Sequence, residues 1–139
     1  MEIDSIVQYV SDTFDEVEVM RPSDGPGAGD VFFIHVQDAK QFPFATIVTK
    51  NYTGFDEQSQ LDRPGVFRLN VGVSRETFRG LFATDAEPDY AALDVLLPHP
   101  VYAPQSYVSV LNPSDATFES VKPLLAEAYA LAAKRVGAK

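Results

Sequence analysis

Two polar side chains that could bind a ligand lie two residues apart in a segment typical of a β-strand. Arg68 and Asn70 alternate with apolar residues between positions 66 and 73, so strand geometry predicts one shared face and a separation of about 7 Å. Arg63 lies shortly before this strand and could reach the same region. A planar guanidinium beside an amide suits a carboxylate or a phosphate. Alternatively, Arg68 pairs with an acid such as Asp62 and holds the preceding loop in place.

The two histidines are the side chains best suited to proton transfer near neutral pH. His35 alternates with Val31 and Phe33, which predicts a half-buried, hydrogen-bonded histidine on a strand. His99 lies between two prolines, which fix its direction at an element boundary. Neither histidine has a neighbouring partner from a known catalytic motif, and no His-x-His or His-x-x-x-His spacing indicates a metal site. We therefore predict no catalytic residue, no metal ligand and no cofactor.

The chain also lacks the motifs of common nucleophilic enzymes. It has no cysteine, and it contains no Gly-x-Ser-x-Gly, Ser-x-x-Lys or P-loop sequence. The leading hypothesis is a small non-enzymatic binding module for an anionic or aromatic small molecule or for a protein partner. A small hydrolase or isomerase that uses one of the histidines is an alternative.

A long segment without a clear period precedes the strand that carries Arg68. It runs from position 50 to 64, and loops of this length in a compact domain are commonly functional or mobile. We predict one polar site closed over by this loop, with an aromatic lid from the loop and a histidine at the rim. Its residues are Arg63, Arg68, Asn70, His99, Tyr52 and Phe55.

Aromatic residues gather around the same segments. They bracket the long loop and flank the late strand, at Phe42, Phe44, Tyr52, Phe55, Tyr102 and Tyr107. Packing accounts for such residues in most proteins. A small apolar pocket between the sheet and the loop is the alternative, because pockets combine aromatic walls with a few placed polar groups.

Hydrophobic periodicity predicts the elements that position these residues. Spacings of three and four residues predict helices at 3–14, from Ser74 to 82, at 90–97 and from about 120 to 136. Alternating or β-branched runs predict strands at 17–20, 31–36, 44–49, 66–73 and 106–111. Pro123 must lie in the first turn of the last helix or kink it. Consecutive strands without helices between them indicate an α+β fold, with an antiparallel sheet of four to five strands and helices packed on one face.

The chain is acidic and has the size of one domain. Its 139 residues predict a single domain over 1–139. Lys and Arg number 11 against 20 Asp and Glu, a formal net charge of -9 that disfavours nucleic acid and anionic lipid. The arginines at 63, 68, 75 and 79 have only Glu76 among them. Together with the basic C-terminus, they leave nucleic-acid binding as an alternative.

Location and assembly are predicted from simpler features. No apolar run approaches the roughly 20 residues of a membrane-spanning helix, and the first residues are acidic, unlike the basic start of a signal peptide. We therefore predict a cytoplasmic protein that does not contact membranes. The run from Val31 to Val36 is hydrophobic on both faces and would pair with a second copy if it formed a sheet edge. We predict a monomer or a homodimer.

Two blocks of sequence carry a family resemblance. The first joins FPFATIVTK at 42–50 with LDRPGVFRLNVGV at 61–73, and the second joins LPHPVY at 97–102 with YVSVLNP at 107–113. They resemble the signature of a bacterial family of small single-domain proteins of unknown function, over essentially the whole chain. This resemblance implies no particular activity.

A more distant resemblance is to the MmcQ/YjbR-like domains. Those domains share an N-terminal helix, a run of antiparallel strands, a strand-to-helix step like residues 67–82, and a closing helix with a tyrosine like Tyr129. The resemblance implies a frataxin-like α+β architecture and, by analogy with double-wing folds, nucleic-acid binding. The chain departs from them at Tyr107, where they usually carry tryptophan, and in its long loop at 50–64.

Overall fold

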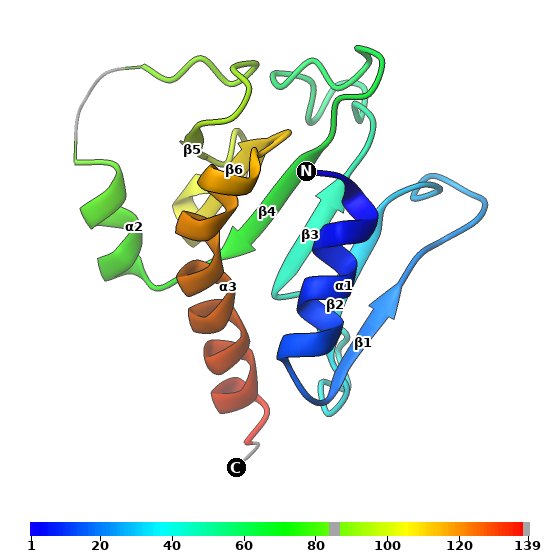
Figure 1. Cartoon of the computed structure of the whole chain (residues 1–139), viewed down its shortest axis with the longest axis vertical. Helices are drawn as coiled ribbons and strands as arrows, with labels where there is room; N and C mark the ends of the chain where they lie inside the picture. Colours follow the sequence, from blue (N-terminus) through cyan, green and yellow to red (C-terminus); the bar gives the residue numbers. More distant parts are fainter. Residues whose placement is uncertain (84–86, 138–139) are drawn as a thin grey trace.

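The computed structural model describes residues 1–83 and 87–137. In these residues the chain forms a six-stranded antiparallel sheet, in the order β1-β2-β3-β4-β6-β5, and three α-helices (Figure 1). The strands are β1 (Val17–Met20), β2 (Val31–His35), β3 (Ala45–Val48), β4 (Arg68–Gly72), β5 (Leu96–Pro98) and β6 (Tyr107–Leu111). The helices are α1 (Ile3–Thr13), α2 (Arg75–Leu81), α3 (Asp115–Arg135) and the 3-10 helix η1 (Ala103–Gln105). The predicted α+β class is confirmed, with six strands in place of four to five.

The additional strand replaces a helix that we predicted at 90–97, and that prediction was wrong. Asp94 has a φ of 61°, which is incompatible with a continuing right-handed helix. Its N–H donates to the carbonyl of Leu111 at 2.7 Å, and its carboxylate accepts from the N–H of Ser114 at 2.7 Å. These bonds direct the chain into β5, which pairs with β6. A strand of three residues is too short to show a period of two in the sequence.

One face of the sheet packs against helices α1 and α3, as predicted. Alternate positions of β2, β3, β4 and β6 are buried on this face, at Val31, Phe33, Ala45, Ile47, Leu69, Val71, Val108 and Val110. The helices run side by side across it (Figure 1), with Tyr9 of α1 5.3 Å from Phe118 of α3 between ring centroids. This layer is the main hydrophobic core, so the opposite face of the sheet is available for other contacts.

Helix α3 begins earlier than the predicted start near position 120. The side chain of Ser114 accepts a hydrogen bond from the N–H of Thr117, and this cap starts the helix at Asp115. Pro123 therefore lies inside the helix. The proline removes one backbone donor, but the apolar side of the helix remains buried around Phe118, Val121 and Leu125.

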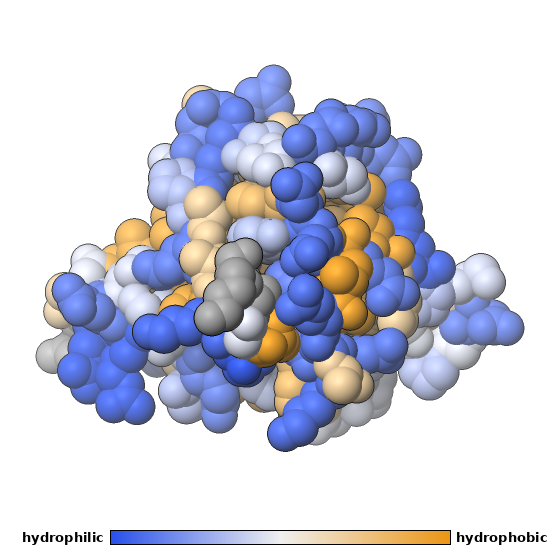
Figure 2. All heavy atoms as spheres, turned by 90° about the horizontal axis from the view of Figure 1, so that it is seen from below, coloured by the Kyte–Doolittle hydropathy of each residue, from blue (hydrophilic) through white to orange (hydrophobic). Residues whose placement is uncertain are grey.

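The surface seen from the C-terminal end of α3 is mainly hydrophilic with hydrophobic patches between the polar residues (Figure 2). In the described ranges, none of the helices has both the length and the apolar character needed to cross a membrane.

Candidate functional site

A strip of polar side chains crosses the sheet face that lies opposite α1 and α3. Asn70 of β4 pairs in register with Thr46 of β3 and Ser109 of β6. Its amide nitrogen donates to the Thr46 hydroxyl at 3.0 Å, and its oxygen accepts from the Ser109 hydroxyl at 2.8 Å. All three residues come from positions that alternate with core residues, which is why the strip lies on one face.

Arg68 is the most deeply buried charged residue of this face, with a relative exposure of 0%. Its Nη1 and Nη2 donate to the two carboxylate oxygens of Asp56 at 2.9 and 2.6 Å. Its Nε donates to Asn70 at 2.8 Å, and Nη1 also donates to the Ser59 hydroxyl at 2.9 Å. Asp56 and Ser59 belong to the loop between β3 and β4, so Arg68 fastens this loop to the sheet.

The alternative that Arg68 pairs with an acid and holds the preceding loop is confirmed, but the acid is Asp56 and not Asp62, the example that we gave. Asp62 is exposed, whereas Asp56 is 6% exposed and makes the bidentate pair. Burial opposes ionisation of the Asp56 carboxyl, but the hydrogen bonds and charge of Arg68 outweigh it and hold the pKa of Asp56 below its usual range. The pair is therefore ionised at neutral pH. Removing either partner would leave a buried uncompensated charge.

His99 lies directly after β5 and is 3% exposed. Its Nδ1 accepts hydrogen bonds from the backbone N–H groups of Val101 and Tyr102, both at 2.9 Å. Its Nε2 lies 3.3 Å from Nη2 of Arg68. Burial, assisted by the charge of Arg68, lowers the pKa of His99 to about 4, so this histidine is neutral at pH 7.

These polar groups form part of the wall of a cavity of about 500 Å³ between the sheet and the loops. Six aromatic rings line it, from Phe32, Phe42, Tyr52, Phe55, Tyr102 and Tyr107. Phe42 and Phe55 are each 58% exposed and Tyr102 is 43% exposed, so these side chains form an apolar rim that solvent reaches. Phe55 and Tyr102 face each other across 6.0 Å between ring centroids.

A second buried carboxylate, Asp30, holds the start of the long loop. It accepts from the backbone N–H and the hydroxyl of Thr49, both at 2.9 Å, and from the hydroxyl of Tyr52. Lys50 Nζ lies 3.6 Å from the same carboxylate. Burial and this carboxylate raise the pKa of Tyr52, so the phenol stays protonated and remains a donor.

Five of the six predicted site residues line this cavity. They are Arg68, Asn70, His99, Tyr52 and Phe55. The sixth, Arg63, does not line the cavity. It donates to the backbone carbonyls of Ser59, Gln60 and Ala91, each at 2.9 Å, and so stabilises the loop.

Several residues of the cavity were not predicted as site residues. Asp56 lies in the segment that has no period, and Asp30 lies at the end of a turn before β2. Local pattern alone does not reveal which carboxylate will meet Arg68. Phe32, Thr46 and Tyr107 could have been found from register, because each lies on the same sheet face as Asn70 or Arg68.

The proposed arginine patch is not a continuous surface. Arg68 is buried, Arg63 is half-buried against backbone carbonyls, and only Arg75 and Arg79 of α2 are exposed. At the C-terminus, Lys139 lies outside the described residues. The four arginines therefore do not offer phosphate groups a shared surface.

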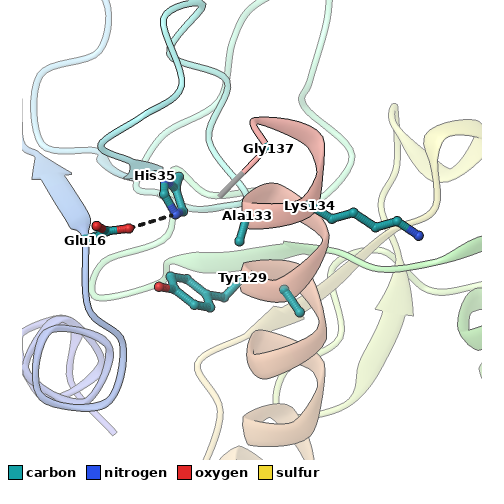
Figure 3. Close-up of a pocket in the computed structure, with 7 residues that line it drawn as sticks. Glu16, His35, Tyr129, Ala133, Lys134 and Gly137 are labelled. Carbon is teal, nitrogen blue, oxygen red and sulfur yellow. Dashed lines mark ion pairs between the residues drawn. The ribbon is translucent and has the colours of Figure 1, made fainter. Parts of the chain in front are cut away.

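His35 lies on the other side of the sheet, beside α3 (Figure 3). It is 1% exposed rather than half-buried, its Nδ1 accepts from the N–H of Gln37 at 3.1 Å, and its ring stacks on Tyr129 at 5.7 Å between centroids. Its Nε2 points to the carboxylate of Glu16, 3.6 Å away, in a cavity of about 510 Å³ (Figure 3). Lys134 also lines this cavity, but its side chain extends away from the histidine.

The two histidines thus lie on opposite faces of the sheet and do not form one site. Within residues 1–83 and 87–137, no group of three or more histidine and carboxylate side chains is arranged to hold a metal ion.

Comparison with known proteins provides a family but no activity. No curated protein matches the chain, and no solved structure matches it. One family model matches residues 1–139, and its description is a family of unknown function, DUF6194. The sheet, the fastened loop and the aromatic cavity therefore belong to a member of the DUF6194 family.

Proposed function

We propose that this chain is a non-enzymatic binding module whose aromatic cavity takes up a small, mainly apolar molecule that carries an aromatic ring. The observation that supports this most strongly is the combination of six aromatic rings with a buried polar floor in one cavity of about 500 Å³. Ligand pockets commonly combine apolar walls with a few placed polar groups. The three exposed aromatic side chains at the rim would lose solvent contact when a ligand enters.

Between the anionic and the aromatic ligand that the sequence suggested, the contacts favour the aromatic one. Four of the five N–H groups of Arg68 already donate to Asp56, Asn70 and Ser59. Arg63 donates to the loop backbone. The arginines therefore have little capacity left for a carboxylate or phosphate. A protein partner that inserts an aromatic side chain between the rim residues is the second candidate.

Catalysis by a histidine is less well supported. A histidine with a pKa of about 4 is a weak base at neutral pH. Both ring nitrogens of His99 face N–H donors, and neither lies within hydrogen-bond distance of a hydroxyl among the described residues. We therefore propose binding rather than proton transfer as the role of this cavity.

The remaining predictions stay proposals. Nucleic-acid binding would need a surface that the four arginines do not form, as described above. A MmcQ/YjbR-like architecture is supported by the N-terminal helix, the antiparallel sheet and the closing helix with Tyr129. The predicted cytoplasmic location likewise stays a proposal.

The proposal is tested with 2-ethylnaphthalene, an aromatic hydrocarbon without polar groups, titrated against the ¹⁵N-labelled chain. We expect shifts of the amide signals of Phe32, Thr46 and Tyr107. The double variant Phe42→Ala/Phe55→Ala should bind about tenfold more weakly, because two aromatic contacts of about 0.5–1.5 kcal/mol each are lost at the rim.

Leu81→Ala is the matched control, since Leu81 is a 40% exposed apolar residue on α2 that does not line the cavity. Its affinity should equal that of the unmodified chain. Absence of shifts at these amides, or equal weakening by the control variant, would refute the proposal.

A further inference from the structure

His99 is surrounded by donors on both ring nitrogens. Nδ1 faces the backbone N–H groups of Val101 and Tyr102, and Nε2 faces Nη2 of Arg68 at 3.3 Å. A neutral imidazole has one acceptor nitrogen and one N–H, and a guanidinium has no acceptor. In either tautomer, one side of the ring therefore places an N–H against another N–H.

The number of backbone donors decides between the tautomers. With Nδ1 as the acceptor, the N–H groups of Val101 and Tyr102 are both satisfied at 2.9 Å, whereas the other tautomer would place the Nδ1 proton against both of these N–H groups. His99 consequently carries its proton on Nε2. That proton faces Arg68, which cannot accept it.

Arg68 has one N–H left for this region. Its other four donate to Asn70, Ser59 and the two oxygens of Asp56. The fifth, on Nη2, points to His99. With the proton of His99 on Nε2, two N–H groups from side chains that are 0% and 3% exposed lie together in the cavity wall, and none of the described residues places an acceptor between them.

The charged groups of the cavity wall are already compensated. Arg68 is paired with Asp56, and Asp30 lies 3.6 Å from Lys50. An anionic ligand would gain no unpaired positive charge here. A neutral acceptor with two lone pairs, such as a carbonyl oxygen, suits two adjacent N–H donors.

We propose that the ligand of this cavity is an aromatic compound with a neutral carbonyl group, whose oxygen accepts hydrogen bonds from Nη2 of Arg68 and Nε2 of His99. This inference rests on the proposed binding function and adds the polar group of the ligand. The aromatic body lies between the rings of the cavity, and the carbonyl reaches the polar floor.

The test compares two molecules of the same shape, 2-acetylnaphthalene and 2-ethylnaphthalene, by the NMR titration described above. We expect the ketone to bind at least tenfold more tightly, the size of effect expected when a hydrogen bond to a charged donor is added. The carboxylate 2-naphthoate should bind more weakly than the ketone. A tighter carboxylate would overturn the assignment of a neutral group.

Two substitutions at His99 distinguish the roles of its two ring nitrogens. In His99→Asn, the amide oxygen takes the place of Nδ1 and can accept from Val101 and Tyr102, but no donor replaces Nε2. The affinity ratio of ketone to hydrocarbon should then fall to about two or less. In His99→Gln, the amide nitrogen reaches the position of Nε2, and a ratio above about five should remain. Leu81→Ala, which is remote from the cavity, should retain the full ratio.

The tautomer is measured independently, by the two-bond ¹H–¹⁵N correlations of the imidazole in the free protein. We expect the proton on Nε2, and a proton on Nδ1 would overturn the inference. If the hydrocarbon binds and the ketone binds no more tightly, the proposed carbonyl group is wrong, but the proposal that the cavity binds aromatic compounds is upheld. If neither molecule binds, both proposals are wrong.

Discussion

At the residue scale, the most informative contact is the pair formed by Arg68 and Asp56. The sequence left two roles open for this arginine, a loop clamp or a ligand contact. Because of its bidentate contact with Asp56, the arginine mainly holds the loop on the sheet, and a single N–H is left for a ligand. Buried ion pairs contribute little net stability, but a broken one is costly because the remaining charge has no partner.

We expect Arg68→Met to lower the free energy of unfolding by about 3–5 kcal/mol, because Asp56 keeps a buried charge without a counterion. The double variant Arg68→Met/Asp56→Leu should recover at least half of that loss. Urea denaturation of the unmodified chain, of the single variants Arg68→Met and Asp56→Leu and of the double variant measures both effects.

Arg63→Met is the control for this pair, since it removes bonds to backbone carbonyls without leaving a buried carboxylate unpaired. Arg63→Met should lower the free energy of unfolding by less than Arg68→Met does. If the double variant were as unstable as the sum of its single substitutions, the clamp would not depend on charge compensation.

His99 predicts a pH dependence of stability. The pKa of this histidine is about 4 in the folded chain, where Arg68 and Asp56 face it, against roughly 6.5 in the unfolded chain. Between these values the unfolded state binds more protons, so stability falls as the pH is lowered from 6.5 to 4. The difference of the two pKa values corresponds to about 3 kcal/mol.

Measured by urea denaturation at pH 7 and pH 4.5, the loss of stability should be smaller in His99→Asn than in the unmodified chain by about 2–3 kcal/mol. The carboxylates titrate in both proteins and largely cancel in the comparison. The same loss in both proteins would contradict the assignment of a neutral buried histidine.

At the element scale, β4 contributes side chains to both faces of the sheet. Leu69 and Val71 enter the core, while Arg68 and Asn70 face the cavity. Gly72 continues the cavity face, and the ring of Tyr107 from β6 packs directly over it. The Tyr107 hydroxyl donates to the carbonyl of Pro43 at 3.1 Å, so this ring ties β6 to the segment before β3.

Gly72→Ala should destabilise the chain by about 1–3 kcal/mol, the usual range for an overpacked contact. The added Cβ would lie 2.9 Å from Cζ of Tyr107, so the ring must shift and lose its bond to Pro43. Thermal unfolding followed by circular dichroism measures the change.

Gly80→Ala is the matched substitution on α2, where no atom lies within 4 Å of the added Cβ. It should be neutral or stabilising by up to about 1 kcal/mol, because alanine favours the helix over glycine. An equal effect of both substitutions would show that contact with Tyr107 does not matter.

At the scale of the whole molecule, the sheet separates two environments. One face is covered by α1 and α3 and contains the apolar core, and the other is covered by the loops and contains the cavity. Helix α2 and the rim of the cavity carry exposed apolar side chains, including Leu81 and Phe42.

Assembly follows from which strands lie at the edges. β2 is paired on both sides, with β1 and with β3, so its hydrophobic run cannot recruit a second copy as an edge strand would. The edges are β1, with four residues, and β5, with three residues and a proline that has no N–H. These short edges favour a monomer over a homodimer, which remains a prediction.

The sequence by itself determined the α+β class, most of the strands and the shared face of Arg68 and Asn70. These features depend on periods of two and 3.6 residues, which a run of neighbouring residues displays without reference to the rest of the chain. The start of a helix at Ser74 was also predicted, and the structure confirms it, because the Ser74 side chain accepts a hydrogen bond from the N–H of Thr77.

Three features were decided only by the tertiary structure. They are the acid that pairs with Arg68, the arginine that lines the cavity, and the strand formed by residues 96–98. Asp56 lies 12 positions from Arg68 in a loop without a period, and β5 exists because β6 supplies its backbone partners. The tautomer of His99 likewise depends on two backbone donors and one guanidinium that converge on its ring. Such contacts are set by the packing of segments distant in the sequence, and no local pattern encodes them.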